Sequence, residues 1–155
     1  MEIIKATIQD KENALILLDN FRTICFKIQN PGQSNLSNTA TKKWWKLFDE
    51  VINSSLWAIF LAKDDNKYIG IVTVYKIPQI RKWVYCAEIE ELFVDENFHG
   101  KWVALLLINN VIEWAKNNDI NNIRLETSSE LKRAHKFYEK VGFKLYGQAY
   151  IKDLN

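Results

Sequence analysis

The chain has 155 residues, 48% of them hydrophobic, and a formal net charge of +2 at pH 7. This length fits one domain of ordinary size, and the composition predicts a globular fold rather than a disordered chain. The near balance of charge argues against nucleic acid or an anionic membrane surface as the main partner.

The N-terminus and the cysteines indicate a reducing, intracellular environment. Residues 1–5 lack the basic start and apolar stretch of a signal peptide, and the longest apolar run, 103–108, is far too short to span a membrane. Cys25 and Cys86 have no metal-like spacing, and His99 and His135 are isolated. We therefore expect a cytoplasmic protein with no membrane partner, no disulfide framework and no metal site.

Apolar periodicity and turn residues predict ten elements. In chain order, they are a strand 3–8, a helix 13–26 capped by Asp10, a helix from Thr39 or Thr41 to about Asn53, strands 56–63, 68–75 and 83–94, a helix 100–118, a strand 123–127, a helix 131–141 and a last strand 143–151, or two short ones. A loop at 29–38, a break at Pro78 and a helix stop at Gly142 separate them.

The order β, α, α, β, β, β, α, β, α, β contains no internal repeat and no shift in composition. We expect one domain over residues 1–155. Hairpin strands followed by βαβ units predict an α/β fold, a mixed central sheet with helices on both faces.

The segment from Glu88 to Lys116 carries the clearest chemical signal. It predicts a strand that ends at Val94, a short polar turn, and a helix that begins near Gly100 to Val103. The first turn of a helix exposes N–H groups without partners, and its dipole favours an anion, so this end is a candidate phosphate site.

This segment resembles the acyl-coenzyme A grip of the GNAT N-acetyltransferases. In that family a strand end contacts the pantetheine arm and an Arg/Gln-x-x-Gly-x-Gly/Ala turn wraps the pyrophosphate. The corresponding residues here are Leu92, Phe93 and Val94 in the strand and His99, Gly100, Lys101, Trp102, Val103 and Ala104 in the turn. His99 replaces the usual Arg or Gln, and Trp102 stands where the family usually has Gly.

A second element, Ala134 to Phe143, resembles the family's Ala-x-x-x-Tyr-x-x-x-Gly-Phe pattern almost completely. A helix would carry Tyr138, Gly142 would stop it, and Phe143 would begin a strand. The family often has Asn seven residues before this Tyr, where this chain has Leu131. The resemblance follows the whole chain in element order, but its motifs lie between Glu88 and Phe143.

The resemblance implies two catalytic groups. Glu90 is the candidate base that takes a proton from an amine of pKa about 10.4, and Tyr138 is the candidate acid, since a phenol of pKa about 10 is protonated at neutral pH. Alternation along a strand puts Glu88, the reserve base, on the face of Glu90 and turns Glu91 the other way. The alternatives are that these carboxylates face solvent or bind a substrate ammonium without catalysis, and that Tyr138 is a core tyrosine.

The sequence thus predicts an acetyl-CoA-dependent N-acetyltransferase that acetylates a primary amine, with a small cationic amine favoured, by direct attack in a ternary complex. A homodimer is common in the family. Two alternatives stay open: a GNAT-fold binding or scaffold protein with a degenerate coenzyme A site, which Trp102 and Leu131 would favour, and an acetyltransferase toxin acting on charged tRNA, which the charge balance disfavours. Trp44 and Trp45 are interpreted as helix packing rather than an acceptor pocket.

Overall fold

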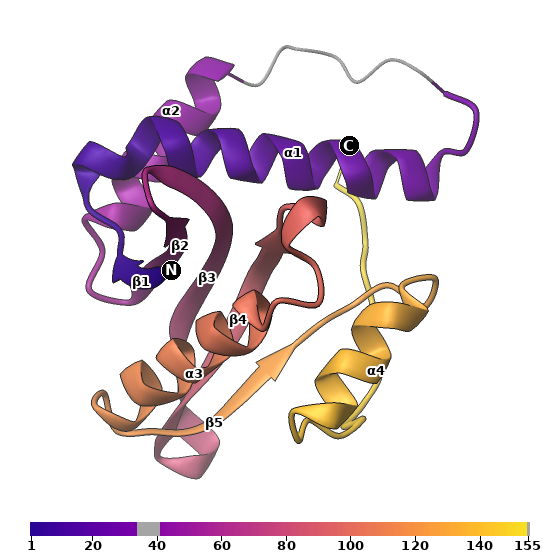
Figure 1. Ribbon diagram of the computed structural model, residues 1–155. Coiled ribbons are helices and arrows are strands. Elements are labelled where there is room, and N and C mark those ends of the chain that lie inside the picture. Colours follow the sequence, from indigo (N-terminus) through magenta and orange to yellow (C-terminus); the bar gives the residue numbers. More distant parts are fainter. Residues whose placement is uncertain (34–40, 155) are drawn as a thin grey trace.

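The computed structural model describes residues 1–33 and 41–154, and Figure 1 shows their arrangement. The strands are β1 (Glu2–Lys5), β2 (Trp57–Asp64), β3 (Lys67–Gln79), β4 (Val84–Val94) and β5 (Ile120–Leu125). The helices are α1 (Lys11–Gln29), α2 (Thr41–Ile52), α3 (Val103–Lys116) and α4 (Lys132–Lys140). Half of the expected loop at 29–38 and the whole of the expected cap at Thr39 fall outside the described residues, as does the side chain of Thr41.

The described strands form one mixed sheet in the order β1-β2-β3-β4-β5. The first four pair antiparallel with their neighbours, and β5 pairs parallel with β4. Helix α3 makes the crossover that a parallel pair requires. The predicted mixed sheet is confirmed, whereas one domain over residues 1–155 stays a prediction.

The helices cover both faces of the sheet, as predicted (Figure 1). On one face, Leu17 of α1 and Phe48 of α2 pack against strand residues such as Ile71. On the other, the apolar stripe of α3, which includes Leu107, packs against strand residues such as Val72, and Phe137 of α4 joins this cluster. Burial of such side chains is the main favourable term in folding.

A glycine lets α3 lie close to the sheet. A Cβ at Gly70 would stand 3.0 Å from the carbonyl oxygen of Phe93 and 3.2 Å from Leu107 Cδ1. Both distances are shorter than ordinary van der Waals contact, so a larger residue would push α3 away from β3 or separate β3 from β4. The position of α3 at the end of β4 therefore depends on this residue.

Two predicted boundaries are wrong for identifiable reasons. The strand does not break at Pro78, which pairs with Tyr85 while β3 continues to Gln79. This part of β3 extends beyond its last pair with β2, Trp57–Tyr75, so one of its edges is open and a missing N–H is tolerated there. Helix α3 begins at Val103 rather than Gly100, because Gly100 and Trp102 both have positive φ.

The expected last strand is also wrong. Residues 144–154 have no regular secondary structure, although Gly142, with φ of 97°, ends α4 as predicted. In Figure 1 this yellow segment runs past α4 without joining the sheet. A strand needs a partner for its N–H and C=O groups, and none of the other described elements lies beside this segment as one. No helix in the described ranges has the length and hydropathy needed to cross a membrane.

Candidate active site

Strands β4 and β5 separate halfway along β4. Their pairing ends at Ile89 opposite Leu125, whereas β4 continues to Val94. Within the described chain, residues 90–94 therefore have no strand on the side where β5 would continue. The gap offers backbone N–H and C=O groups to an extended ligand, as an open sheet edge does.

A β-bulge lies where the strands separate. Thr73 of β3 pairs with Glu91 and Val74 pairs with Ile89, so Glu90 is the extra residue on β4. Its side chain is exposed and lines the groove described below. Bulges often occur beside active sites, where they redirect a side chain.

The bulge corrects the predicted orientation of the three carboxylates. Glu88 pairs with Tyr75 and Glu91 with Thr73, and these two β3 residues lie on one face of the sheet. Glu88 and Glu91 therefore share a face, contrary to the prediction that Glu91 turns away from Glu88. An extra residue at Glu90 shifts the alternation by one position, which the period of two could not anticipate.

The reserve base Glu88 is held in an ion pair. Its Oε2 lies 2.6 Å from Arg124 Nη2 and accepts a hydrogen bond from Arg124 Nε at 2.7 Å. Glu88 is buried, so the guanidinium compensates a carboxylate that would otherwise be expensive to keep there. This pairing makes Glu88 a weaker candidate for proton transfer than Glu90.

Glu91 has an unusual protonation equilibrium that the sequence did not reveal. Burial, and secondarily the neighbouring Glu90 carboxylate, raises the pKa of Glu91 to about 7. Thr73 Oγ1 donates a hydrogen bond to Glu91 Oε2 and accepts one from the Glu91 backbone N–H at 3.1 Å. Glu91 is therefore partly protonated near neutral pH, whereas Glu90 is exposed to solvent.

The turn after β4 presents the start of α3. Trp102 is its N-cap with φ of 65°, and Gly100 has φ of 79°. No described side chain caps this end, so the N–H groups of Val103 and Ala104 are available to an anion. The Trp102 indole is 65% exposed and therefore does not fill the turn.

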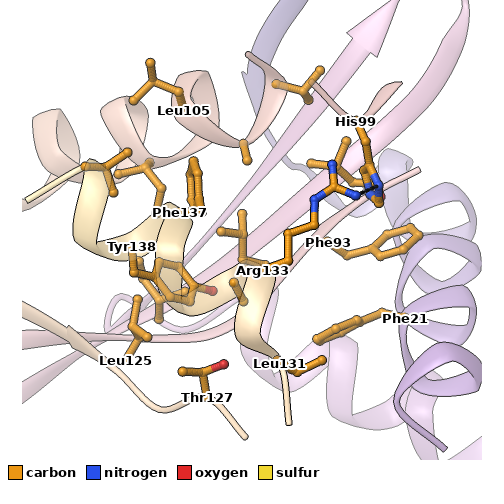
Figure 2. A pocket seen from close by; sticks show the side chains of 18 of the residues that line it. Phe21, Phe93, His99, Leu105, Leu125, Thr127, Leu131, Arg133, Phe137 and Tyr138 are labelled. Atoms are coloured by element: carbon orange, nitrogen blue, oxygen red, sulfur yellow. Dashed lines mark hydrogen bonds between the residues drawn. The ribbon is translucent and has the colours of Figure 1, made fainter. Parts of the chain in front are cut away.

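Cationic groups surround this turn. Lys101 Nζ lies 4.6 Å from the ring centroid of Phe98, and Lys140 Nζ lies 5.6 Å from that of Trp102. His99 Nε2 donates to the carbonyl oxygen of Val94 at 2.9 Å, which leaves Nδ1 to accept from Arg133 Nη1 at 3.3 Å (Figure 2). The donors and cations at this turn fit a phosphate-bearing group.

A groove of about 1100 Å³ joins these parts (Figure 2). Phe21 of α1 and Phe93 of β4, stacked at 5.9 Å, form one wall, and Tyr138 of α4 and Leu125 of β5 contribute to the other. The hydroxyl of Tyr138 points toward the interior of the groove. Such a groove is long enough for an extended ligand and mostly apolar, as ligand sites usually are.

Helix α4 holds Tyr138 in place. The Tyr138 ring packs edge-on against Phe143 at 5.8 Å, and His135 Nε2 donates to the Ser128 carbonyl oxygen at 2.9 Å, which ties the helix to the loop after β5. Burial raises the pKa of Tyr138, so its phenol keeps the proton at neutral pH. Such a group can donate a proton.

The groove brings together most of the site residues predicted from the sequence. It is lined by Glu90, Leu92, Phe93, Val94, His99, Gly100, Trp102, Val103, Ala104 and Tyr138. Lys101 lies in the same turn but does not line it, and Trp44 and Trp45 pack under the cations Arg22 and Lys11. The sequence missed Arg133 and Phe21, although Arg133 stands directly before Ala134 in the quoted helix.

Comparison with known proteins decides the family. The family model described as "Acetyltransferase (GNAT) family" matches residues 22–143. The chain belongs to the GNAT acetyltransferase family. The matched range of this GNAT protein contains the point where β4 and β5 separate, here called the fork. It also contains the turn before α3 and the helix that carries Tyr138.

One curated relative of this GNAT protein is named as an N-acetyltransferase and another as an N-acetylaspartate synthetase. An uncharacterized N-acetyltransferase of Methanocaldococcus jannaschii is 41% identical over 105 residues, which are 66% of this chain and 46% of that protein. The N-acetylaspartate synthetase of Danio rerio is 33% identical over 95 residues, 61% of this chain and 31% of that protein. The chain spans less than half the length of either relative.

Solved structures show the same fold. A probable acetyltransferase superposes with a TM-score of 0.82 at 19% identity, over 100% of this chain and 99% of that one. A ribosomal-protein-alanine N-acetyltransferase of Brucella melitensis gives 0.75 at 14% identity, over 99% and 98%. Within residues 1–33 and 41–154, no cluster of three or more His, Cys, Asp or Glu side chains could hold a metal ion.

Proposed function

We propose that this protein is an acetyl-CoA-dependent N-acetyltransferase that acetylates a primary amine by direct attack in a ternary complex. The observation that carries the proposal is the fork between β4 and β5, which opens beside the uncapped start of α3. An extended amide-bearing arm fits the fork, and a phosphate fits the helix start. One groove connects the two.

Acetyl-CoA would supply the acetyl group as an activated thioester. Leu92, Phe93 and Val94 would bind its pantetheine arm along β4, and the turn from His99 to Ala104 would bind its phosphates through N–H groups. Arg133 would add a cation that can form two parallel hydrogen bonds to a phosphate. Placement of both substrates in one groove lowers the entropic part of the barrier.

Two side chains would move protons. Glu90, at the bulge, would take the proton of the attacking amine directly or through water, and Tyr138 would give its proton to the departing sulfur. The exposure of Glu90 at the groove supports the first role, and the raised pKa of Tyr138, which keeps its phenol protonated at neutral pH, supports the second. Glu91 lies beside the base without lining the groove.

A small cationic amine is the acceptor that we propose. The support is the carboxylates Glu90 and Glu126 at the groove, which would attract an ammonium group. The names of relatives point to more than one acceptor, because one is an N-acetylaspartate synthetase and another an aminoglycoside acetyltransferase. A screen of polyamines, aminoglycosides, amino acids and peptide N-termini with acetyl-CoA, read as free thiol release, would identify the class.

The rival is a GNAT-fold binding protein with a degenerate coenzyme A site. Calorimetric titration with coenzyme A separates the two, because we expect the wild type to bind and Trp102→Gly to change the affinity less than threefold. The exposed indole leaves the N–H groups accessible in both proteins. No binding by the wild type together with binding by Trp102→Gly would establish the rival.

We also propose a cytoplasmic location and a homodimer for this protein. The cysteines Cys25 and Cys86 are free thiols, which suits a reducing cytoplasm. A homodimer is also proposed, and the balanced charge argues against nucleic acid as a partner.

A further inference from the structure

Arg133 of α4 is a cation that no acid neutralises. Within residues 1–33 and 41–154, no carboxylate forms an ion pair with it, whereas Arg124, for example, is paired with Glu88. The Arg133 side chain lines the groove. An arginine side chain has five N–H donors and no acceptor, so one that keeps its full charge at a ligand site attracts an anion.

A neutral imidazole holds this cation instead. His99 Nε2 donates to the carbonyl oxygen of Val94 at 2.9 Å, which fixes the tautomer of the ring, and Nδ1 accepts from Arg133 Nη1 at 3.3 Å. A carboxylate in the place of Nδ1 would cancel the charge of the guanidinium, whereas an uncharged acceptor restrains the side chain and leaves the charge available. The Arg133 donors on Nε and Nη2 have no partner in the described part of the chain.

The hydrogen bond between these two side chains joins separate elements of the groove wall (Figure 2). His99 follows β4 in the turn before α3, Arg133 lies in the first turn of α4, and both line the groove. No other hydrogen bond joins α4 to residues 95–102 in the ranges that the structure describes. A free arginine side chain carries about 2 kcal/mol of rotamer entropy, so without His99 the guanidinium would be spread over many positions.

The turn that receives Arg133 already offers donors to an anion. The N–H groups of Val103 and Ala104 have no side-chain cap, and Lys101 belongs to the same turn. A guanidinium adds two parallel donors that match the oxygens of one phosphate. Its contribution is greatest when it is already in place, because the ligand then does not have to order it.

We propose that His99 is a positioning residue, whose imidazole holds the Arg133 guanidinium at the turn before α3, where it binds a phosphate of acetyl-CoA. This inference rests on the proposed function and adds to it a role for the His99 side chain, which acts through Arg133 and needs no contact with the ligand. The pair also accounts for the departure at position 99, because the turn carries an acceptor there and the guanidinium comes from α4.

Calorimetric titration with coenzyme A tests the pair through four variants. His99→Leu removes both hydrogen bonds of the ring and Arg133→Ala removes the cation, so each should weaken binding about tenfold, near the lower end for a hydrogen bond to a charged group. The double variant should bind no more weakly than Arg133→Ala alone, because His99 then has nothing to position. His99→Gln should stay within about twofold of the wild type, since an amide can both donate to Val94 and accept from Arg133.

Lys136→Ala and pantetheine are the matched controls. Lys136 is an exposed cation of α4 that does not line the groove, so its loss should leave the affinity for coenzyme A unchanged. Pantetheine lacks the phosphates, so its affinity should be the same for the wild type and for every variant.

Additive losses in the double variant, an equal loss of pantetheine affinity, or His99→Gln as weak as His99→Leu would each overturn the proposal, because His99 would then act on the end of β4 rather than on Arg133. A loss in Lys136→Ala equal to that in Arg133→Ala would overturn it as well, since general charge would be the cause. No binding of coenzyme A by the wild type would end both this inference and the proposed function. The expected pattern of affinities without thiol release from any acceptor would keep this inference and end the proposed acetyl transfer.

Discussion

Tyr138 is the residue whose removal should separate chemistry from binding. Replacement by Phe deletes the hydroxyl that points into the groove and keeps the ring packed on Phe143. We expect kcat to fall about 100-fold, the lower end of the range for a general acid, with coenzyme A affinity unchanged. Thiol release and calorimetry measure the two quantities, with Tyr146→Phe, an exposed residue after α4, as control. A wild-type kcat would assign Tyr138 to packing.

Glu91 should make the protein more stable at acid pH than at alkaline pH. Burial raises its pKa from 4.5 to about 7, so the folded protein favours the protonated form. This stabilisation is complete below pH 4.5 and is lost as the pH rises through 7, at most about 3 kcal/mol. Glu91→Gln should therefore be more stable than the wild type at pH 8, and this gain should disappear near pH 4.5.

Urea unfolding at pH 4.5, 6 and 8 measures this difference. The exposed Glu139 of α4 offers the matched control, because Glu139→Gln removes one carboxylate without changing a buried site. If the gain of Glu91→Gln were the same at all three pH values, the loss of charge at Glu91 would not be its cause.

At the scale of elements, α4 depends on the residue that stops it. Gly142 has φ of 97°, and a Cβ there would meet no atom within 4 Å. Gly142→Ala should therefore destabilise the fold by about 1–2 kcal/mol through backbone strain alone. Gly147→Ala is the control, since Gly147 lacks a positive φ and also stands in open space. Equal denaturation midpoints for the two variants would contradict this account.

The sequence predicted the elements that close their hydrogen bonds locally. The spacing of Leu107, Val111 and Ala115 was enough to identify α3, because a helix satisfies its own backbone. The expected strand at 143–151 failed, because strand propensity cannot show whether a partner is present. The bulge at Glu90 was hidden for a related reason, since it is a property of the register between two strands. The sequence therefore predicted which residues belong to the site, but it did not predict which way the carboxylates of β4 face.

At the scale of the whole molecule, the ligand should bridge α1 on one face of the sheet and α3 and α4 on the other. The groove is lined by residues of α1, β4, α3 and α4. A ligand that binds only the folded state adds about 2.7 kcal/mol at 100 times its Kd. For a domain of this size, coenzyme A at that concentration should raise Tm by roughly 5–11 °C.

Pantetheine measures how much the fork contributes to affinity without the start of α3. It lacks the phosphates and can occupy only the fork of β4 and β5, so we expect it to raise Tm by a small fraction of the coenzyme A effect. Differential scanning calorimetry measures both shifts. Equal shifts at equal concentration would mean that the start of α3 contributes nothing to affinity.

The bulge at Glu90 also has an evolutionary consequence. The register on either side, Val74 with Ile89 and Thr73 with Glu91, is already that of a strand from which Glu90 has been removed. Loss of one codon would therefore delete the proposed base and straighten β4 without moving any neighbouring pair. A descendant that kept the fold and the groove but lacked the proposed catalytic carboxylate is one deletion away, so a single step could turn the proposed enzyme into a binding protein.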